Sequence, residues 1–339
     1  MSSFSPRLEV VIPTYNRAAE LKLRLEELSP QLQEGEQITI FDNGSTDTTQ
    51  DVCGIHAADP RVKVHRWSHN RGLSRNVMRC FEEARGEFVW VLSDDDPVRP
   101  DALPLLREIL STCSGKLLLF KAQGNSVRQN ALFTSSASFL GRQSIMDLSY
   151  ISSLVFHRET LDPHLGLLAP GAYSILPHVL VYVSAISEAT PLETFTQQLL
   201  IDKLGETRVS RMEFLLGATT LPSFFADPIL RKRVAQQIRS ATRWMLFSAL
   251  AQTSTARDRQ EWRRVLRMAD HALACCGATF WAAIAPSSLH SGKDKLRELL
   301  KMLILRLPDP VLGLAARRVS QRTNQTPDRV TCDARIGGA

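Results

Sequence analysis

Three consecutive carboxylates, Asp94, Asp95 and Asp96, directly follow an apolar run at residues 88–92. Acidic side chains at the end of a buried strand repel one another and are partly desolvated, so a divalent cation would stabilise them. Mg²⁺ and Mn²⁺ take oxygen ligands and usually keep phosphate oxygens in their coordination shell. Taken alone, the triplet therefore indicates either a metal–phosphate site or the acidic start of a helix near Asp101.

Polar residues also follow three earlier segments that have the apolar patterns of strands. The segments are residues 8–12, 37–41 and 62–64, and the candidate site residues after them are Pro13, Thr14, Tyr15, Asp42, Asn43 and Asn70. Stretches with helical spacing separate the strands, which predicts βαβ units and a mostly parallel sheet flanked by helices. Ligands of such sheets bind beyond the carboxyl ends of the strands. Four polar strand ends at one edge therefore predict a single binding site.

The alternation of strands and helices weakens along the chain. Further expected elements are strands at 116–120 and 151–157, a loop at 134–138, a helix within 171–186, and helices at 228–251, 260–275 and 293–307. Asp47 and Gln50 have the spacing of a capping box at the start of a short helix. We predict an α/β domain over residues 1–210, divided into halves at 1–125 and 126–210, then a helical region at 211–321 and a disordered tail at 322–339.

Composition limits the class of protein. The 339 residues are 44% hydrophobic and 22% charged, which is typical of a soluble globular protein. Six cysteines without CxxC pairs or neighbouring histidines argue against zinc and against a disulfide framework, and favour reduced thiols in the cytoplasm. We expect no signal peptide and no transmembrane helix, because no uninterrupted run of about 18 apolar residues exists.

Four motifs resemble those of family 2 glycosyltransferases with the GT-A fold. Residues 10–17 resemble the family's opening strand, residues 41–47 its second-strand motif, residues 70–76 the loop before its third helix, and residues 93–96 its metal-binding DxD segment. Their order and spacing make the resemblance specific over about residues 7–125, and it is loose over 126–205. One departure is Ser93, where many relatives carry an acid, so the choice of metal ligand within the triplet stays open.

The resemblance implies an inverting glycosyltransferase. Such an enzyme moves a sugar from a nucleotide-diphosphate donor to a hydroxyl of a glycan or lipid-linked acceptor, assisted by Mn²⁺ or Mg²⁺, here in O-antigen, capsule or exopolysaccharide biosynthesis. The metal stabilises the charge that grows on the leaving diphosphate. The implied metal ligands are Asp95 and Asp96, and the implied donor-binding residues are Pro13, Thr14, Tyr15, Arg17, Asp42, Asn43, Asn70, Arg75 and Asp94. Three of these have simpler explanations: Asp42-Asn43-Gly44 as a tight turn, Arg75 as the partner of a surface acid, and Asn70 as a cap at the entry to a helix.

The catalytic base is less clear in the sequence. The family usually supplies an acidic pair from the second half of the domain, and here that place carries Leu176-Pro177-His178. We predict His178 as the base because imidazole has a suitable pKa, although a lone histidine on an apolar helix is often structural. Glu188, Glu193 and Asp202 are the alternatives, and residues 157–159 are expected at the acceptor pocket.

The C-terminal part is basic, within a formal net charge of +6. At residues 293–307, leucines and Ile304 share one helical face while lysines and arginines lie elsewhere around it. This pattern predicts either peripheral contact with an anionic membrane, at the inner face of the cytoplasmic membrane, or packing on the catalytic domain. We expect no nucleic-acid partner, because no recognised binding module accompanies the basic residues.

Two other functions fit part of the sequence. A nucleotidyltransferase also uses a Rossmann-like sheet and carboxylate-bound metal, but it usually has a glycine-rich loop after the first strand, where residues 13–17 contain no glycine. A catalytically degenerate GT-A scaffold would explain the missing acidic pair. Binding of a nucleoside diphosphate with metal would separate an enzyme from a scaffold.

Overall fold

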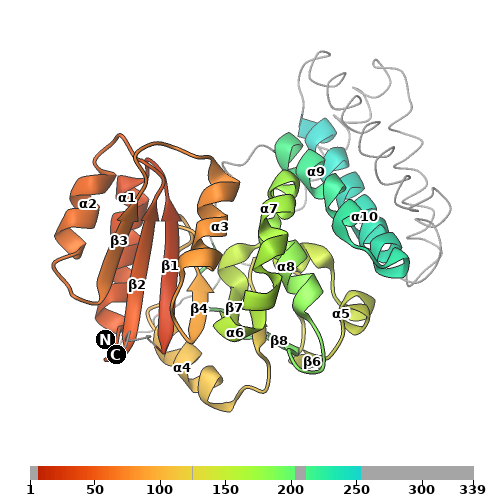
Figure 1. Ribbon diagram of the computed structural model, residues 1–339, viewed down its shortest axis with the longest axis horizontal. Coiled ribbons are helices and arrows are strands. Elements are labelled where there is room, and N and C mark those ends of the chain that lie inside the picture. The colour runs from red at the N-terminus through yellow and green to blue at the C-terminus, as the bar shows by residue number, and fades with distance from the viewer. Residues whose placement is uncertain (1–6, 124, 203–210, 253–339) are drawn as a thin grey trace, which may run out of the picture.

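A single eight-stranded sheet runs through the molecule, with helices on both faces (Figure 1). The computed structural model describes residues 7–123, 125–202 and 211–252. The strands are β1 Leu8–Thr14, β2 Glu36–Asp42, β3 Val62–Arg66, β4 Phe88–Val91, β5 Leu117–Phe120, β6 Ala131–Phe133, β7 Leu154–His157 and β8 Leu192–Phe195. Their order across the sheet is β3-β2-β1-β4-β7-β5-β8-β6.

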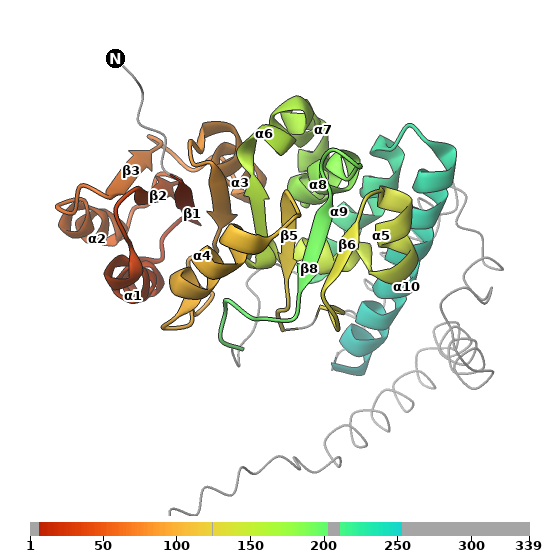
Figure 2. The same cartoon turned by 90° about the horizontal axis from the view of Figure 1, so that it is seen from below.

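The helices connect the strands and cover the sheet. They are α1 Ala18–Leu28, α2 Thr49–His56, α3 Leu73–Glu83, α4 Ala102–Thr112, α5 Ser136–Arg142, α6 Arg158–Leu161, α7 Leu168–Gly171, α8 Pro177–Ala185, α9 Arg211–Thr220 and α10 Pro228–Gln252. One core cluster joins α1 and α4 to one face of the sheet, and a second joins α3 and α8 to the other. Figure 2 shows α1 and α4 together on their side of the strands.

The first four strands form the parallel half of the sheet. β1 pairs in parallel with both β2 and β4, and β2 pairs in parallel with β3. Val11 faces one core cluster, whereas Val10 and Ile12 face the other. A strand that is buried on both faces needs a continuous apolar run, and this is why the segment lacks the alternation of a half-exposed strand. The predicted α/β architecture is confirmed.

The second half of the sheet is mixed, because β7 lies antiparallel between β4 and β5. Phe88, at the start of β4, is opposite His157, at the end of β7. The turn that precedes β7, residues 151–153, therefore lies at the edge of the sheet where β4 ends. Because β7 is antiparallel to β4, its amino end lies at the expected binding edge. In a parallel strand, the carboxyl end would lie there.

Helices α9 and α10 pack on the same core as the sheet. Ala218, Val234 and Ile238 belong to the cluster that contains Val11 and α3. The domain boundary near residue 210 stays a prediction, as do the expected helices at 260–275 and 293–307 and the tail at 322–339, which lie outside the described residues. Within the part of the chain that is described, no helix is long and apolar enough to cross a membrane.

Three local predictions differ from the structure. The expected loop at 134–138 is wrong from Ser136 onward, because the Ser135 side chain accepts a hydrogen bond from the Ser138 N–H and caps α5. The expected capping box is also wrong: α2 begins after Thr48, and Asp47 instead accepts hydrogen bonds from Thr49. The short strand β6 at the edge of the sheet and its neighbour β8 were not predicted, since only three and four residues carry their pattern.

Candidate functional site

The carboxyl ends of β1, β2 and β4 meet at one edge of the sheet, as the strand-end pattern predicts. The Thr14 hydroxyl, at the end of β1, donates a hydrogen bond of 2.7 Å to Oδ2 of Asp94, beyond the end of β4. Asn43, just after β2, donates its backbone N–H to the Thr14 carbonyl at 2.9 Å. These bonds join three strand ends into one polar surface.

Asp94 lies between Thr14 and Arg17. Nη1 of Arg17 is 3.2 Å from Oδ1 of Asp94. Burial raises the pKa of the Asp94 carboxyl to about 7, against the opposing effects of the Arg17 charge and the Thr14 hydrogen bond. Near neutral pH, the charge of Asp94 therefore depends on which cation lies beside it.

Asp95 is the most open member of the triplet. Its side chain is 26% exposed, and Oδ2 lies 2.9 Å from Nη1 of Arg17. Its other oxygen, Oδ1, accepts a hydrogen bond of 2.6 Å from the Ser93 hydroxyl. Ser93, which departs from the family pattern, thus orients the neighbouring carboxylate.

Asp96 points in the opposite direction, into the protein. It is 2% exposed. Its Oδ2 accepts a hydrogen bond of 2.6 Å from the Ser152 hydroxyl. Burial, together with the charge of Asp96 and a hydrogen bond to it, raises the pKa of the Tyr150 phenol. Tyr150 and Ser152 therefore hold Asp96 on the side of β7, and the prediction that Asp96 binds the metal does not fit this placement.

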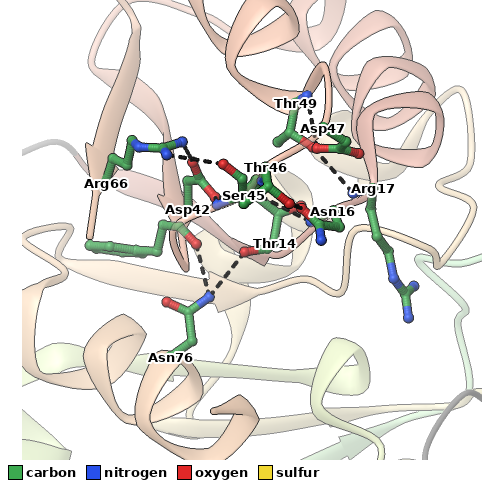
Figure 3. A network of polar contacts seen from close by, with 11 residues as sticks. Thr14, Asn16, Arg17, Asp42, Ser45, Thr46, Asp47, Thr49, Arg66 and Asn76 are labelled. Carbon is green, nitrogen blue, oxygen red and sulfur yellow. Dashed lines mark hydrogen bonds and ion pairs between the residues drawn. The ribbon is translucent and has the colours of Figure 1, made fainter. Parts of the chain in front are cut away.

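Arg17 reaches the triplet because the turn after β1 is fixed. Asn16 has a left-handed backbone conformation with φ of 52°. Its N–H donates to Oγ of Ser45, and the Arg17 N–H donates to Oγ1 of Thr49 at 3.2 Å. Figure 3 shows the Arg17 side chain pointing away from the network that holds its backbone. Asn16 tolerates this conformation better than most residues other than glycine.

Asp42 is enclosed by protein groups rather than open to a ligand. It is 1% exposed. Oδ1 accepts hydrogen bonds from the N–H and hydroxyl of Ser45, and Oδ2 lies 2.7 Å from Nη1 of Arg66 (Figure 3). The turn interpretation accounts for these contacts. Donor binding by the Asp42 carboxylate would require Arg66 or Ser45 to give up its place.

Asn43 fixes the loop before α3. Its Oδ1 accepts a hydrogen bond of 2.9 Å from the Arg71 N–H, and its Nδ2 donates to Oδ1 of Asn70 at 2.9 Å. Asn70 also accepts from the Gly72 N–H at 2.8 Å. Gly72 has φ of 87°, a conformation that side chains rarely adopt. Asn43 and Asn70 therefore shape the loop, and Asn70 initiates the turn into the helix.

The exposed groups at this edge include Tyr15, Arg71 and Arg75. Arg75 lies in the first turn of α3 and forms no ion pair within the described part of the chain, so the alternative of a surface acid finds no partner there. The Arg71 guanidinium lies 4.9 Å from the centre of the Trp67 ring. Pro13 is only partly exposed, and Thr14 acts through its side chain as well as its backbone.

The residues fit a metal that is completed by its ligand rather than a self-sufficient metal centre. No group of three or more histidine, cysteine, aspartate or glutamate side chains in the described residues is placed to hold a metal. Mg²⁺ sites in nucleotide enzymes commonly need only one or two carboxylates, because substrate phosphates supply further oxygens. Asp95, with Asp94 beside it, fits such a site.

His178 does not lie at this edge. It is 4% exposed, its ring stacks on Phe81 with centroids 6.4 Å apart, and Nε2 lies 3.0 Å from the Leu148 carbonyl. Burial lowers the pKa of the ring to about 4. A histidine among core side chains cannot reach an acceptor hydroxyl, so the prediction that His178 is the catalytic base does not fit the structure.

The alternative acids lie at different edges of the sheet. Glu193 accepts hydrogen bonds from the N–H groups of Ser114 and Gly115, before β5, which is the edge opposite the triplet. Glu188, in the turn before β8, lies toward the same edge. Asp202 follows Ile201, whose N–H donates to the Pro97 carbonyl at 2.9 Å, just beyond the triplet. Of the three alternatives, only Asp202 adjoins the site.

The expected position of residues 157–159, at the acceptor pocket, does not fit the structure either. His157 ends β7 and lies 3.8 Å from Glu87, before β4. Because β7 is antiparallel to β4, its carboxyl end is at the edge away from the triplet, and its amino end brings Tyr150 and Ser152 to the site. The sequence shows a strand here but not its direction, and so these two residues were missed.

Residues 9–114, which contain all four motifs, match the family described as Glycosyl transferase family 2. Abequosyltransferase RfbV of Salmonella typhimurium is 24% identical over 277 residues, which cover 71% of this chain and 82% of that protein. The GalNAc(5)-diNAcBac-PP-undecaprenol beta-1,3-glucosyltransferase of Campylobacter jejuni is 32% identical over 105 residues, which cover 30% of this chain and 34% of that protein.

The fold is similar to that of solved glycosyltransferase structures. S. aureus TarS 1-349 in complex with UDP aligns with a TM-score of 0.60 over 94% of this chain and 92% of that chain, at 15% identity. TarS 1-349 in complex with UDP-GlcNAc aligns with a TM-score of 0.55 over 79% of this chain and 81% of that chain. The predicted GT-A fold is confirmed by these similarities and by the sheet itself.

Proposed function

Because residues 9–114 match Glycosyl transferase family 2, we propose that this chain is a glycosyltransferase of that family. It would transfer a sugar, with inversion and with the help of Mn²⁺ or Mg²⁺, from a nucleotide-diphosphate donor to a hydroxyl of a glycan or lipid-linked acceptor. The observation that carries the proposal is the partly open Asp95 carboxylate at the edge where three strand ends meet. The nucleotidyltransferase alternative has no comparable support, because the relatives are named as sugar transferases.

The donor half of the site consists of residues from the first four strands. Asp95, with Asp94 beside it, would hold the metal, which when bound stabilises the negative charge of the leaving diphosphate. Tyr15 and Arg75 are exposed beside the fixed loops and can contact the base or the diphosphate. Asn43 and Asn70 keep the loop before α3 in shape, and Asp42 keeps the turn after β2 in shape.

The acceptor half supplies the base in this proposal. Inversion requires a group that takes the proton from the attacking hydroxyl as the new bond to the sugar forms. Asp202 is exposed beside the triplet and lies close enough to Tyr150 for its charge to raise the pKa of that phenol, after the larger effects of burial, Asp96 and Asp95. We assign the proton-accepting role to Asp202.

The names of two relatives support a proposal for the acceptor class. The C. jejuni relative is named for a PP-undecaprenol compound, and the S. typhimurium relative for transfer of abequose. A lipid-linked acceptor in cell-surface polysaccharide assembly is the corresponding proposal for this chain. It would place the enzyme at the cytoplasmic face of the membrane, which the basic helix expected at residues 293–307 would contact.

The test begins with thermal-shift measurements using UDP, GDP, CDP and dTDP with Mn²⁺, and continues with donor hydrolysis or transfer for the nucleotide that stabilises the chain. Asp95→Asn is expected to lower metal-dependent turnover at least about 100-fold, the usual effect of removing a group that stabilises transition-state charge. Asp101→Asn is the matched control, because within the described residues the Asp101 side chain pairs with Arg99, on the surface. Unchanged turnover in the Asp95 variant contradicts the metal assignment, and no binding of any nucleotide favours the scaffold.

A further inference from the structure

One guanidinium nitrogen contacts two carboxylates of the triplet. Nη1 of Arg17 lies 3.2 Å from Asp94 and 2.9 Å from Asp95. The Arg17 side chain is 17% exposed, so this ion pair is largely shielded from water and salt. Arg17 therefore supplies the positive charge that these acids need when no other cation is present.

The backbone on either side of Arg17 is held independently of the triplet. Its N–H donates to Thr49, and the Ala18 N–H donates to Oδ2 of Asp47. The side chain is consequently the part that can turn without unfolding the loop. Arginine also matches a diphosphate well, because its planar fork of donors pairs with phosphate oxygens as it does with carboxylate oxygens.

A divalent cation on Asp95 would compete with Arg17 for the same oxygen. Oδ2 of Asp95 is the oxygen that Nη1 of Arg17 approaches, whereas Oδ1 accepts the Ser93 hydroxyl, so a cation on Oδ2 would meet the guanidinium. Two positive charges around one carboxylate repel each other, and Coulomb repulsion is strong where water is excluded. A phosphate ligand for Arg17 would remove this conflict.

We propose that Arg17 is a positioning residue that occupies Asp95 in the metal-free enzyme and releases it to the metal when its guanidinium transfers to the donor diphosphate. The inference rests on the proposed metal-assisted function. It implies that metal alone binds weakly and that the metal and the nucleoside diphosphate strengthen each other's binding. The thermodynamic coupling is reciprocal, so either ligand can be used to measure it.

The test measures Mn²⁺ binding, by electron paramagnetic resonance of the free ion, to the full chain with and without UDP or the nucleotide that stabilises it. Arg17→Gln is expected to bind Mn²⁺ alone about tenfold more tightly than the wild type, and to show weaker coupling to the nucleotide, within the usual range of coupling between ligands. Arg17→Lys keeps the charge and is expected to bind Mn²⁺ alone as weakly as the wild type. Asp95→Asn is expected to abolish Mn²⁺ binding, both alone and combined with either Arg17 variant.

Lys22→Gln is the matched control, because it removes one positive charge from α1, the helix that follows Arg17, at an exposed pair with Glu26. Equal or weaker Mn²⁺ binding by the Arg17→Gln variant overturns the inference, as does an equal gain in the Lys22 variant. Those results leave the proposed function standing. If neither the wild type nor any variant binds Mn²⁺ with any nucleotide, both the proposed metal and the proposed role of Arg17 are wrong. Sugar transfer itself is tested separately, by turnover.

Discussion

Replacing His178 with phenylalanine separates a core role from a catalytic one. Phenylalanine keeps an aromatic ring against Phe81 but removes the Nε2–H that donates to the Leu148 carbonyl. At neutral pH, the variant should unfold about 1–2 kcal/mol more easily, because a buried carbonyl loses its donor. The more informative effect appears in acid, where only the wild type can be protonated at this position.

The sign of the acid effect follows from the lowered pKa. Burial lowers the His178 pKa from 6.5 to about 4 in the folded protein, and Nδ1 is buried without a hydrogen-bond partner, so a proton added there would be unpaired. The folded state therefore binds fewer protons than the unfolded state between these values. The contribution of His178 to the free energy of unfolding is therefore fully present above pH 6.5 and is lost as the pH falls toward 4. The loss is about 2 kcal/mol by pH 5 and about 3 kcal/mol near pH 4.

Urea unfolding followed by tryptophan fluorescence, at about pH 7 and about pH 5, measures this difference. Acid weakens both proteins through their other carboxylates, but the variant lacks the His178 contribution. Relative to the wild type, its free energy of unfolding should therefore rise by about 2 kcal/mol between the two pH values. Turnover at neutral pH should stay close to that of the wild type.

Two results would refute this reasoning. If the difference between variant and wild type is the same at both pH values, His178 is not held neutral by burial. If turnover falls by about 10²–10⁴-fold while stability changes little, the ring acts as a general base and the acceptor side must rearrange to expose it. The conservative variant His178→Gln, which can still donate to the Leu148 carbonyl, separates loss of that bond from loss of the ring.

Two further predictions concern the sides of the triplet. Ser152→Ala removes the donor to Asp96 and the acceptor of the Ser93 N–H, so it should lower the free energy of unfolding by about 1–3 kcal/mol and weaken Mn²⁺-dependent nucleotide binding. Ser153→Ala is the control, because in the described part of the chain Ser153 bonds to the Tyr150 backbone and not to the triplet. Equal nucleotide binding in both variants would contradict the role of Ser152. Asp202→Asn should lower kcat by about 10²–10⁴-fold with nucleotide binding unchanged. The control Glu188→Gln should leave kcat close to the wild-type value. Equal kcat values for the two variants would exclude Asp202 as the base.

The parallel half of the sheet was predictable because its physics is local. Residues 8–12 and 37–41 have the mostly apolar patterns of strands, and a helical stretch separates them, so parallel pairing with the carboxyl ends at one edge is the expected arrangement. That argument alone brings Thr14, Asp42 and Asp94 together. The ion pair between Arg66 and Asp42 was not predictable, since it depends on the register of β2 with β3.

The prediction of the second half of the sheet failed because it depends on the direction of a strand. The apolar pattern of residues 151–157 indicates a strand, but a strand of either direction has the same pattern. Antiparallel pairing reverses which end of the strand lies at the site. Ser152 therefore contacts the triplet, and His157 lies at the opposite edge of the sheet. The His178 prediction failed for a related reason: an apolar helix was correctly expected, but a polar residue on it was given a role before its burial was known.

The order of the strands also explains how the triplet divides its work, which the sequence leaves open. β4 lies between β1 and β7, so consecutive side chains beyond its end can turn toward one neighbour, outward, or toward the other. Asp94 contacts Thr14 on the side of β1, and Asp96 contacts Ser152 on the side of β7. Asp95 is left between them, facing outward, where Arg17 meets it. The two flanking acids therefore fix the position of the middle one, and a metal bound there would need only one of the three carboxylates as its main ligand.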